Sequence, residues 1–278
     1  MPEEKGTVRL SIKSLTWACG AVALAISFQP LVAATDESDW ATLKQQAFGD
    51  RPISAEDGVV VLDAPYTADD PALVPLTVRV PPAVKQQLKT LTLFIDKNPD
   101  PIVAKISFGP AAGTGGERSF STRVRIDNFS HVRAVLETED GQLHMATKFV
   151  AASGGCGAMQ AKDPDTESVD LGKTLVKVFP PALESGPIWS GLVMIKHPNS
   201  NGMQLDIHTA NVIPARFVKD VIVKRDGELV FSMESTFSIS TNPNFRFTFG
   251  RGPKNSLDVA VTDTAGAMFA AKSEPSGS

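Results

Sequence analysis

Two series of short, β-branched segments occupy most of the chain and limit what it can fold into. Turn sequences such as 96–99 and 139–141 separate the segments, and several of them alternate polar with apolar side chains. The first series comprises 59–62, 76–80, 91–95, 104–108, 120–126, 130–138 and 144–150. The second comprises 188–197, 206–211, 220–225, 228–233, 237–241, 245–249 and 256–262. No long amphipathic helix supports an α/β enzyme fold, and each series predicts an antiparallel sandwich.

The predicted fold is therefore all-β, with two immunoglobulin-like β-sandwich domains in tandem, at 35–152 and 173–272. A segment without hydrophobic period, 153–172, is interpreted as a Gly/Ser/Asp linker loop, and 273–278 as a tail. Contacts between the two sandwiches are expected from 109–116, 180–181 and Trp189. The expected core side chains are Phe94, Ile95, Val124, Ile126, Val135, Val193, Ile195, Val221, Val223, Phe237 and Phe247.

The N-terminal residues have the pattern of an export signal. Basic Lys5, Arg9 and Lys13 precede an apolar run, 15–28, and small residues at 32–34 form a cleavage site, so 1–34 is predicted to be a signal peptide. An uncleaved anchor is the alternative, but the apolar run is too short to span a bilayer comfortably. After cleavage, residues 36–48 have the spacing of a short amphipathic helix, with Thr35 or Asp36 as its N-cap.

Cys156 is the strongest candidate for a functional residue. The chain has 2 cysteines, and removal of the signal peptide leaves only Cys156, set between Gly154, Gly155 and Gly157. Structural cysteines of exported proteins usually come in pairs, so a single one indicates intermolecular pairing or a working thiol. The flexible glycines predict a thiol that is presented at the surface, with a pKa near the ordinary value of about 8.5.

Other chemistries find little support in the composition or the motifs. A net charge of -4 favours neither nucleic acid nor, after signal cleavage, an anionic membrane. The chain has four histidines, His131, His144, His197 and His208. They lack metal-ligand spacing and are interpreted as scattered surface or turn residues, so neither a metal nor a cofactor is predicted. Enzymatic use of Cys156 would need a base held beside a rigid nucleophile, which its flexible neighbours disfavour.

Two groups of segments carry a resemblance to known proteins. The first group is 94–101, 122–126, 132–134, 140–141 and 154–157, and it resembles SoxY, the thiol-bearing half of the SoxYZ sulfur carrier. The second group is 196–198 with Gly202, 213–215, 217–218 and 242–247, and it resembles SoxZ, the partner of SoxY. The chain as a whole resembles a fused SoxYZ-like carrier of the type associated with quinoprotein dehydrogenases.

This resemblance implies a non-enzymatic periplasmic carrier that holds a sulfur-containing adduct covalently on Cys156, with Gly154, Gly155 and Gly157 as arm glycines. Its partners would be sulfur-metabolism or quinoprotein dehydrogenase-associated enzymes and cytochromes, and its two halves would share an interface. In SoxY the Gly-Gly-Cys-Gly-Gly sequence ends the chain, whereas here Ala158 follows Gly157 and the chain continues. The thiol is therefore expected on a tethered loop, which suits a partner with an open cleft.

Two alternatives to the carrier remain open at this point. In the first alternative, the chain is a non-covalent accessory binding module for a quinoprotein dehydrogenase or its cytochrome, and the thiol is vestigial or regulatory. In the second it is a structural redox protein that dimerises through Cys156.

Overall fold

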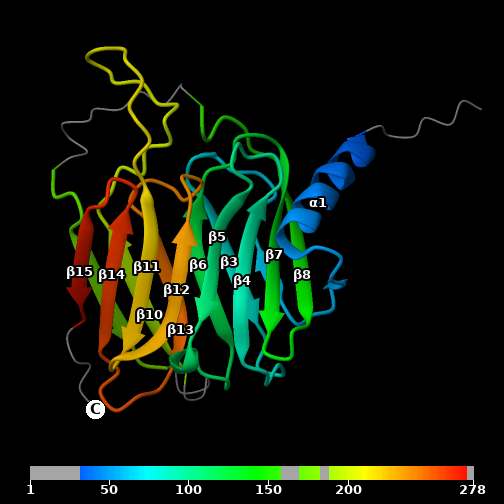
Figure 1. Cartoon of the computed structure of the whole chain (residues 1–278), viewed down its shortest axis with the longest axis vertical. Coiled ribbons are helices and arrows are strands. Elements are labelled where there is room, and N and C mark those ends of the chain that lie inside the picture. The colour runs from blue at the N-terminus through cyan, green and yellow to red at the C-terminus, as the bar shows by residue number, and fades with distance from the viewer. Residues whose placement is uncertain (1–31, 158–168, 182–187, 274–278) are drawn as a thin grey trace, which may run out of the picture.

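The computed structural model describes residues 32–157, 169–181 and 188–273, which form a two-layer β-sandwich with one long helix (Figure 1). One sheet has the strand order β1-β8-β7-β4-β5-β12-β11-β14-β15, and the other β2-β3-β6-β13-β10-β9. The helix is α1 (Val32–Phe48), and a 3-10 turn, η1 (Pro110–Ala112), precedes β6. The strands are β1 (Ile53–Ala55), β2 (Val61–Asp63), β3 (Val74–Val80), β4 (Leu88–Ile95), β5 (Ile102–Phe108), β6 (Arg118–Val124), β7 (Ser130–Thr138), β8 (Leu143–Val150), β9 (Thr174–Phe179), β10 (Ile188–Ile195), β11 (Val218–Arg225), β12 (Glu228–Ser235), β13 (Asn244–Gly250), β14 (Leu257–Asp263) and β15 (Met268–Lys272).

The all-β prediction is confirmed, and the two halves of the chain prove to share both sheets. Strand β5 of the first half pairs with β12 of the second, with Ile106 opposite Met233. In the other layer β6 pairs with β13, with Phe120 opposite Phe247. Both junctions are antiparallel, so two half-sandwiches join edge to edge into one continuous sandwich rather than following one another as separate bodies.

Alternation of side chains along the strands builds one core across this junction. On β13, the phenylalanines at 245, 247 and 249 are buried, whereas the residues between them point outward. Phe120 of the first half lies 6.0 Å from Phe231 and 6.0 Å from Phe245 of the second, measured between ring centroids. One cluster of buried apolar residues therefore spans both halves. The expected core residues are buried, except Phe237, which is half-buried against Phe217.

Helix α1 covers a second, smaller cluster on the outer side of β4, β7 and β8 (Figure 1). Trp40 contacts the ring of Phe94 edge-on at 5.4 Å, and the Arg133 guanidinium lies 4.6 Å from the Trp40 ring centroid. The predicted helix ends at Phe48 as expected but begins at Val32, so Thr35 and Asp36 lie inside it and do not cap it. Within the described residues, no helix is long and apolar enough to cross a membrane.

Some predicted strands are wrong, and three observed strands were not predicted. Segment 206–211 is an irregular loop, and 237–241 is an irregular crossing between the layers, because its backbone carbonyls serve side chains of the first half rather than a sheet. Strands β1, β9 and β15 lie at sheet edges and were missed.

Of the expected contacts between halves, Gly109 donates its N–H to the carbonyl of Val230 at 2.8 Å. Residues 1–31, 158–168 and 274–278, which hold most of the predicted signal, linker and tail, lie outside the described residues.

Candidate functional site: the Cys156 arm

The segment 153–157, called the arm below, lies at the end of the sandwich where β8 stops and the long loop 198–217 rises (Figure 1). Backbone hydrogen bonds hold it against the residues that follow β6. Gly154 N–H donates to the carbonyl of Asp127 at 2.8 Å, and Gly155 N–H donates to the carbonyl of Ile126 at 2.9 Å. The arm is therefore docked on the protein.

The three arm glycines have different structural roles. Gly154 has a φ of +86°, a left-handed conformation that favours glycine, with no neighbouring atom within 4 Å of an added Cβ. A Cβ on Gly155 would lie 2.2 Å from the carbonyl oxygen of Pro71 and 2.7 Å from that of Ile126. At Gly157 the nearest atom would be the carbonyl oxygen of Gly154, at an ordinary 3.5 Å. Close packing thus requires glycine at 155, and no such requirement exists at 157.

Cys156 is buried, with 0% of its surface exposed, and the expectation of a presented thiol is wrong for this conformation. Its N–H donates to Asp127 Oδ1 at 3.3 Å. Its carbonyl accepts from Asn201 Nδ2 at 2.8 Å. Asp127 belongs to the first half and Asn201 to the second, so both halves hold the cysteine.

The environment of Cys156 suppresses its ionisation. Burial, and to a smaller extent the nearby Asp127 carboxylate, raises the pKa of the Cys156 thiol to about 12, against an opposing effect of Arg125. The thiolate, not the thiol, is the nucleophile, so the docked sulfur is nearly inert at neutral pH. The prediction of an ordinary thiol pKa is therefore wrong for the docked arm.

Beneath the arm, the first half is joined to the second by a buried polar network. The Arg125 side chain donates to the carbonyls of Phe237 and Ile239, both at 2.6 Å, and to Thr241 Oγ1 at 2.9 Å. Asn98 donates from Nδ2 to the Arg125 carbonyl at 2.8 Å, and its Oδ1 accepts from Asp127 N–H at 2.9 Å. The network fixes the position of the residues on which the arm rests.

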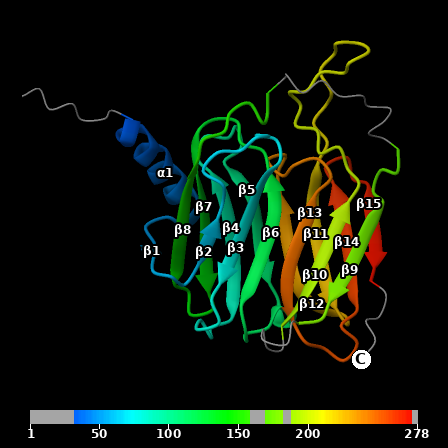
Figure 2. The ribbon, with the colours of Figure 1, turned by 180° about the vertical axis from the view of Figure 1, so that it is seen from behind.

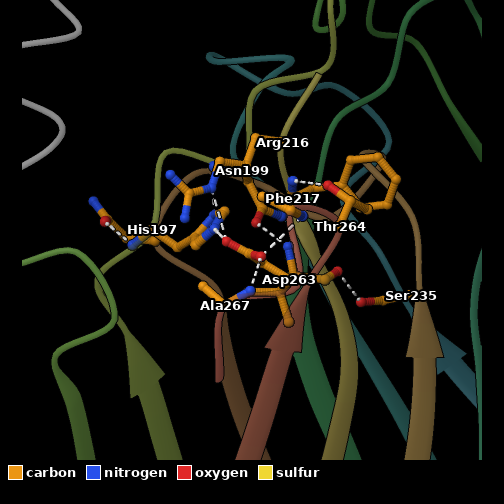
Figure 3. Close-up of polar contacts among 11 residues, drawn as sticks. His197, Asn199, Arg216, Phe217, Ser235, Asp263, Thr264 and Ala267 are labelled. Carbon is orange, nitrogen blue, oxygen red and sulfur yellow. Dashed lines mark hydrogen bonds and ion pairs between the residues drawn. The ribbon is translucent and has the colours of Figure 1, made fainter. Parts of the chain in front are cut away.

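A second network, around Asp263, anchors the two ends of loop 198–217 (Figure 3). This loop carries Asn201. Asp263 accepts from Arg216 Nε at 2.8 Å through Oδ2, and from the N–H groups of residues 265 and 267 through Oδ1. His197 Nδ1 accepts from Asn199 N–H at 3.0 Å, and its Nε2 lies 3.5 Å from Asp263 Oδ2. This arrangement holds Asn201 above the arm.

The charge states in this second network follow from its burial. Burial lowers the pKa of His197, although the neighbouring Asp263 carboxylate opposes this effect. Burial raises the pKa of Asp263, but hydrogen bonds from Ala267 N–H and Arg216 outweigh it and leave the pKa lowered. At neutral pH the loop is thus anchored by a neutral imidazole and a carboxylate paired with a guanidinium.

The histidines do not form a common site. His144 and His197 are buried, contrary to their interpretation as surface or turn residues, whereas His208 is exposed. His144 Nδ1 lies 2.5 Å from Asp57 Oδ2 near the start of β8, whereas the arm follows the end of that strand. Among the residues that the structure describes, no group of three or more His, Cys, Asp and Glu side chains is placed to hold a metal ion.

The structure brings the predicted Cys156, Gly154, Gly155 and Gly157 together in one docked segment and adds residues that the sequence analysis did not assign to the site. Asp127 and Asn201 contact Cys156 directly. The only sequence signal for Asn201 was its place between the SoxZ-like residues 196–198 and Gly202. Arg125 lay inside a SoxY-like segment, but without a role.

Comparison with protein families decides the assignment of the two halves. The family model described as "Sulfur oxidation protein SoxY" matches residues 44–156 and therefore ends at Cys156. The model described as "Sulphur oxidation protein SoxZ" matches residues 177–274. The chain is a SoxY domain followed by a SoxZ domain. SoxY and SoxZ are carrier and accessory proteins rather than enzymes, with immunoglobulin-like folds, and the junction of β5 with β12 is an interface between them.

Two of the solved structures that are similar to the chain cover different shares of it. The sulfur carrier protein SoxY from Chlorobium limicola f thiosulfatophilum is 23% identical, with 43% of this chain and 96% of that one covered and a TM-score of 0.34. A β-glycosidase from Bacteroides vulgatus is 11% identical, with 85% of this chain and 26% of that one covered and a TM-score of 0.23. No curated protein sequence matches the chain.

Proposed function

We propose that the chain is a periplasmic sulfur carrier that holds a covalent adduct on Cys156 and presents it to partner enzymes. The observation that supports this role most strongly is the placement of Cys156 in a docked arm that both the SoxY and the SoxZ domain contact. A carrier must protect its sulfur between encounters, and the docked arm has this property because its thiol is buried and protonated. The periplasmic location follows from the predicted signal peptide and the family.

Undocking of the arm is the step that makes the thiol reactive. Within the described residues, four hydrogen bonds hold the arm at residues 154–156, and a typical net contribution of about 1 kcal/mol each gives an opening cost of about 4 kcal/mol. Once in water, the thiol regains a pKa of about 8.5 and a usable fraction of thiolate. Gly154 lets the chain turn there at little conformational cost.

Loading of the undocked thiol is a sulfur-exchange reaction. The Cys156 thiolate attacks one sulfur of an S–S bond in a disulfide or polysulfide; a new S–S bond forms on Cys156, and the other sulfur leaves as a thiolate. No external oxidant is consumed, because one S–S bond replaces another. Oxidation or removal of the carried sulfur would then be the work of the partner enzymes.

The link to the second domain restricts how the adduct is delivered. The chain continues from Gly157 through residues 158–168 to Val169, so the cysteine lies in a loop that is closed at both ends. A partner would have to admit two chain segments beside the sulfur. This favours partners with an open active-site cleft, among them enzymes or cytochromes associated with quinoprotein dehydrogenases.

Intact-mass spectrometry tests the carrier directly. Mature protein purified without reductant should carry sulfur-containing adducts, and peptide mapping should place them on Cys156. The Cys156→Ser variant should fold normally and lack every adduct. Unmodified Cys156 in all preparations, even after incubation with inorganic polysulfide, would contradict the proposal.

Burial of the thiol also supports a second candidate, a non-covalent accessory module for a quinoprotein dehydrogenase. In that case the inert sulfur of Cys156 would be a structural remnant, and the surfaces of the sandwich would carry the function. Cys156→Ser would then retain full physiological activity. The carrier role requires that the same substitution abolish it.

A further inference from the structure

Strands β6, β13, β10 and β9 are adjacent in the six-stranded sheet (Figure 2). The outer face of these four strands is basic. Register places outward side chains in rows across these strands. Lys177, Leu192 and Arg246 stand side by side, with Ser121 next to Arg246. The neighbouring row has Leu175, Met194 and Asn244. We call this surface the basic face; it also includes Arg123, Lys173, Lys196 and Phe179.

The cations of the basic face have few acidic neighbours. The four strands contain no Asp or Glu. Within the described residues, no carboxylate lies at ion-pair distance from Arg123, Lys177, Lys196 or Arg246, whereas Lys173 lies 3.5 Å from Asp170. A protein with a net charge of -4 thus concentrates unpaired positive charge on one sheet face.

Apolar side chains lie among these cations. Leu175 is 47% exposed and Met194 is 40% exposed. They line an open hollow of about 480 Å³ together with Arg123, Lys173, Lys196 and Asn242. The guanidinium of Arg246 lies 5.1 Å from the centroid of the Phe179 ring, which holds the charge flat on the sheet. Cations around an apolar hollow are a typical arrangement of a protein interaction surface.

The outer face of the nine-stranded sheet has no such bias. There Glu234 stands opposite both Lys105 and Asp220 in the register, and Lys272 pairs with Asp258 at 3.0 Å. That face therefore carries both positive and negative side chains. The asymmetry between the two faces is a property of this chain and does not follow from the sandwich architecture, which treats both faces alike.

The basic face reaches the end of the sandwich where the arm lies. The carbonyl of Arg123 accepts a hydrogen bond from the Ser240 N–H, and Arg123 precedes Arg125 by two residues. Asn242 of the hollow directly follows Thr241, which accepts a hydrogen bond from Arg125. A protein bound on this face would therefore sit beside the arm.

We infer that the basic face is the docking surface for a protein that presents an acidic patch around an apolar side chain. Carboxylates of the partner would pair with Lys177, Lys196, Arg123 and Arg246, and its apolar side chain would enter the hollow between Leu175 and Met194. The inference goes beyond the carrier role, because this binding does not use the thiol. It assigns to the basic face the recruitment that precedes any chemistry at Cys156.

The size of the face argues for a protein rather than a small anion. Strands β9 to β6 span three inter-strand steps, which is about 14 Å, and seven residues of strand extend about 23 Å. One inorganic anion would contact a single cation or two on such a surface. A patch of this size corresponds to a small, transient interface, which suits a carrier that visits its partners in turn.

Titration with a defined acidic peptide, followed by NMR of the full mature chain, tests the inference. The probe is a synthetic peptide in which glutamates flank two central leucines, and its glutamine and lysine versions are controls. We expect amide shifts confined to β6, β13, β10 and β9, binding that weakens with salt, and no binding of the lysine version. Cys156→Ser should bind the peptide as tightly as the unsubstituted chain, so failure here is distinct from failure of the carrier role.

Charge reversal provides matched variants. Lys177→Glu combined with Arg246→Glu should weaken peptide binding at least about tenfold, or about 1.4 kcal/mol. Lys105→Glu combined with Lys224→Glu, on the nine-stranded face, should leave it within about twofold. Thermal unfolding of each variant checks the fold.

Several results would overturn the inference. Equal effects of the two double variants, or shifts located elsewhere, would remove the basic face as the binding surface. Sedimentation that reveals a dimer broken by the Lys177 and Arg246 reversals would assign the face to a second copy of the chain. Tighter peptide binding after neutralisation of Asp163, Asp165 and Glu167, which lie outside the described residues, would assign it to the chain's own acidic segment.

Discussion

Substitution of Gly155 by alanine should release the arm and expose the thiol. The added Cβ would lie 2.2 Å from the carbonyl oxygen of Pro71 and 2.7 Å from that of Ile126, distances that real Cβ atoms essentially never show. Both atoms belong to the backbone, which cannot yield as a flexible side chain would. The docked conformation is therefore lost, while the sandwich below, whose main apolar cluster does not include residues 153–157, should keep its stability.

The expected size of the effect follows from the hydrogen bonds of the docked arm. In the unsubstituted chain, an opening cost of about 4 kcal/mol allows alkylation only through about one molecule in a thousand. Gly155→Ala removes that cost and should accelerate alkylation of Cys156 by iodoacetamide at pH 7.5 between about 10²- and 10³-fold. The free thiol reference is the same protein in denaturant.

Gly157→Ala is the matched control on the other side of the cysteine. Its Cβ would meet no atom closer than 3.5 Å, so the arm should stay docked and the alkylation rate should change less than about threefold. Mass spectrometry at timed intervals gives both rates. Equal rates for the two variants, or an unsubstituted chain that reacts as fast as denatured protein, would refute the docked arm.

Three further predictions concern the same end of the molecule. Docking of the arm should depend on pH, because the pKa of the Cys156 thiol is raised to about 12 in the docked arm and is about 8.5 in water. The free energy of docking is therefore fully available below pH 8.5 and weakens by about 1.4 kcal/mol per pH unit above it. Amide hydrogen exchange of the arm should therefore accelerate between pH 8.5 and 10.5 more than that of β7, and parallel acceleration would contradict this. Asn201→Ala removes the hydrogen bond to the Cys156 carbonyl and should speed alkylation about fivefold, while Asn211→Ala, at an exposed position of the same loop, should not. Arg125→Met leaves the carbonyls of Phe237 and Ile239 without their donor and should lower the free energy of unfolding by about 2 to 4 kcal/mol in urea; a loss no larger than that of the half-exposed Arg123→Met would show that the network adds little.

Sequence patterns predicted the strands that alternate or consist of β-branched residues, because burial on one face of a sheet imposes that pattern. They failed for 237–241, which has the composition of a strand but instead forms an irregular segment whose carbonyls accept hydrogen bonds from Arg125. They also missed β9 and β15, whose edge positions demand little hydrophobicity on the outer side. The pairing of β5 with β12 was beyond local reasoning, since the residues that meet are more than a hundred positions apart.

The site was predicted in its residues but not in its conformation. A single cysteine among glycines identified the chemistry, and the glycines indicated freedom of motion. Whether such a segment is exposed depends on groups distant in sequence, here Asp127 and Asn201, which bind the backbone of Cys156. Glycine permits close approach as readily as it permits flexibility, and at Gly155 close approach prevails.

The shared sheets have a consequence for folding and assembly. Separated from its partner, either half would expose long, unpaired strand edges, those of β5 and β6 or those of β12 and β13, and such edges are templates for aggregation. Synthesis as one polypeptide holds the complementary edges at an effective concentration on the order of millimolar. Fusion therefore enforces equal stoichiometry and lets each half cover the edges of the other as the chain folds.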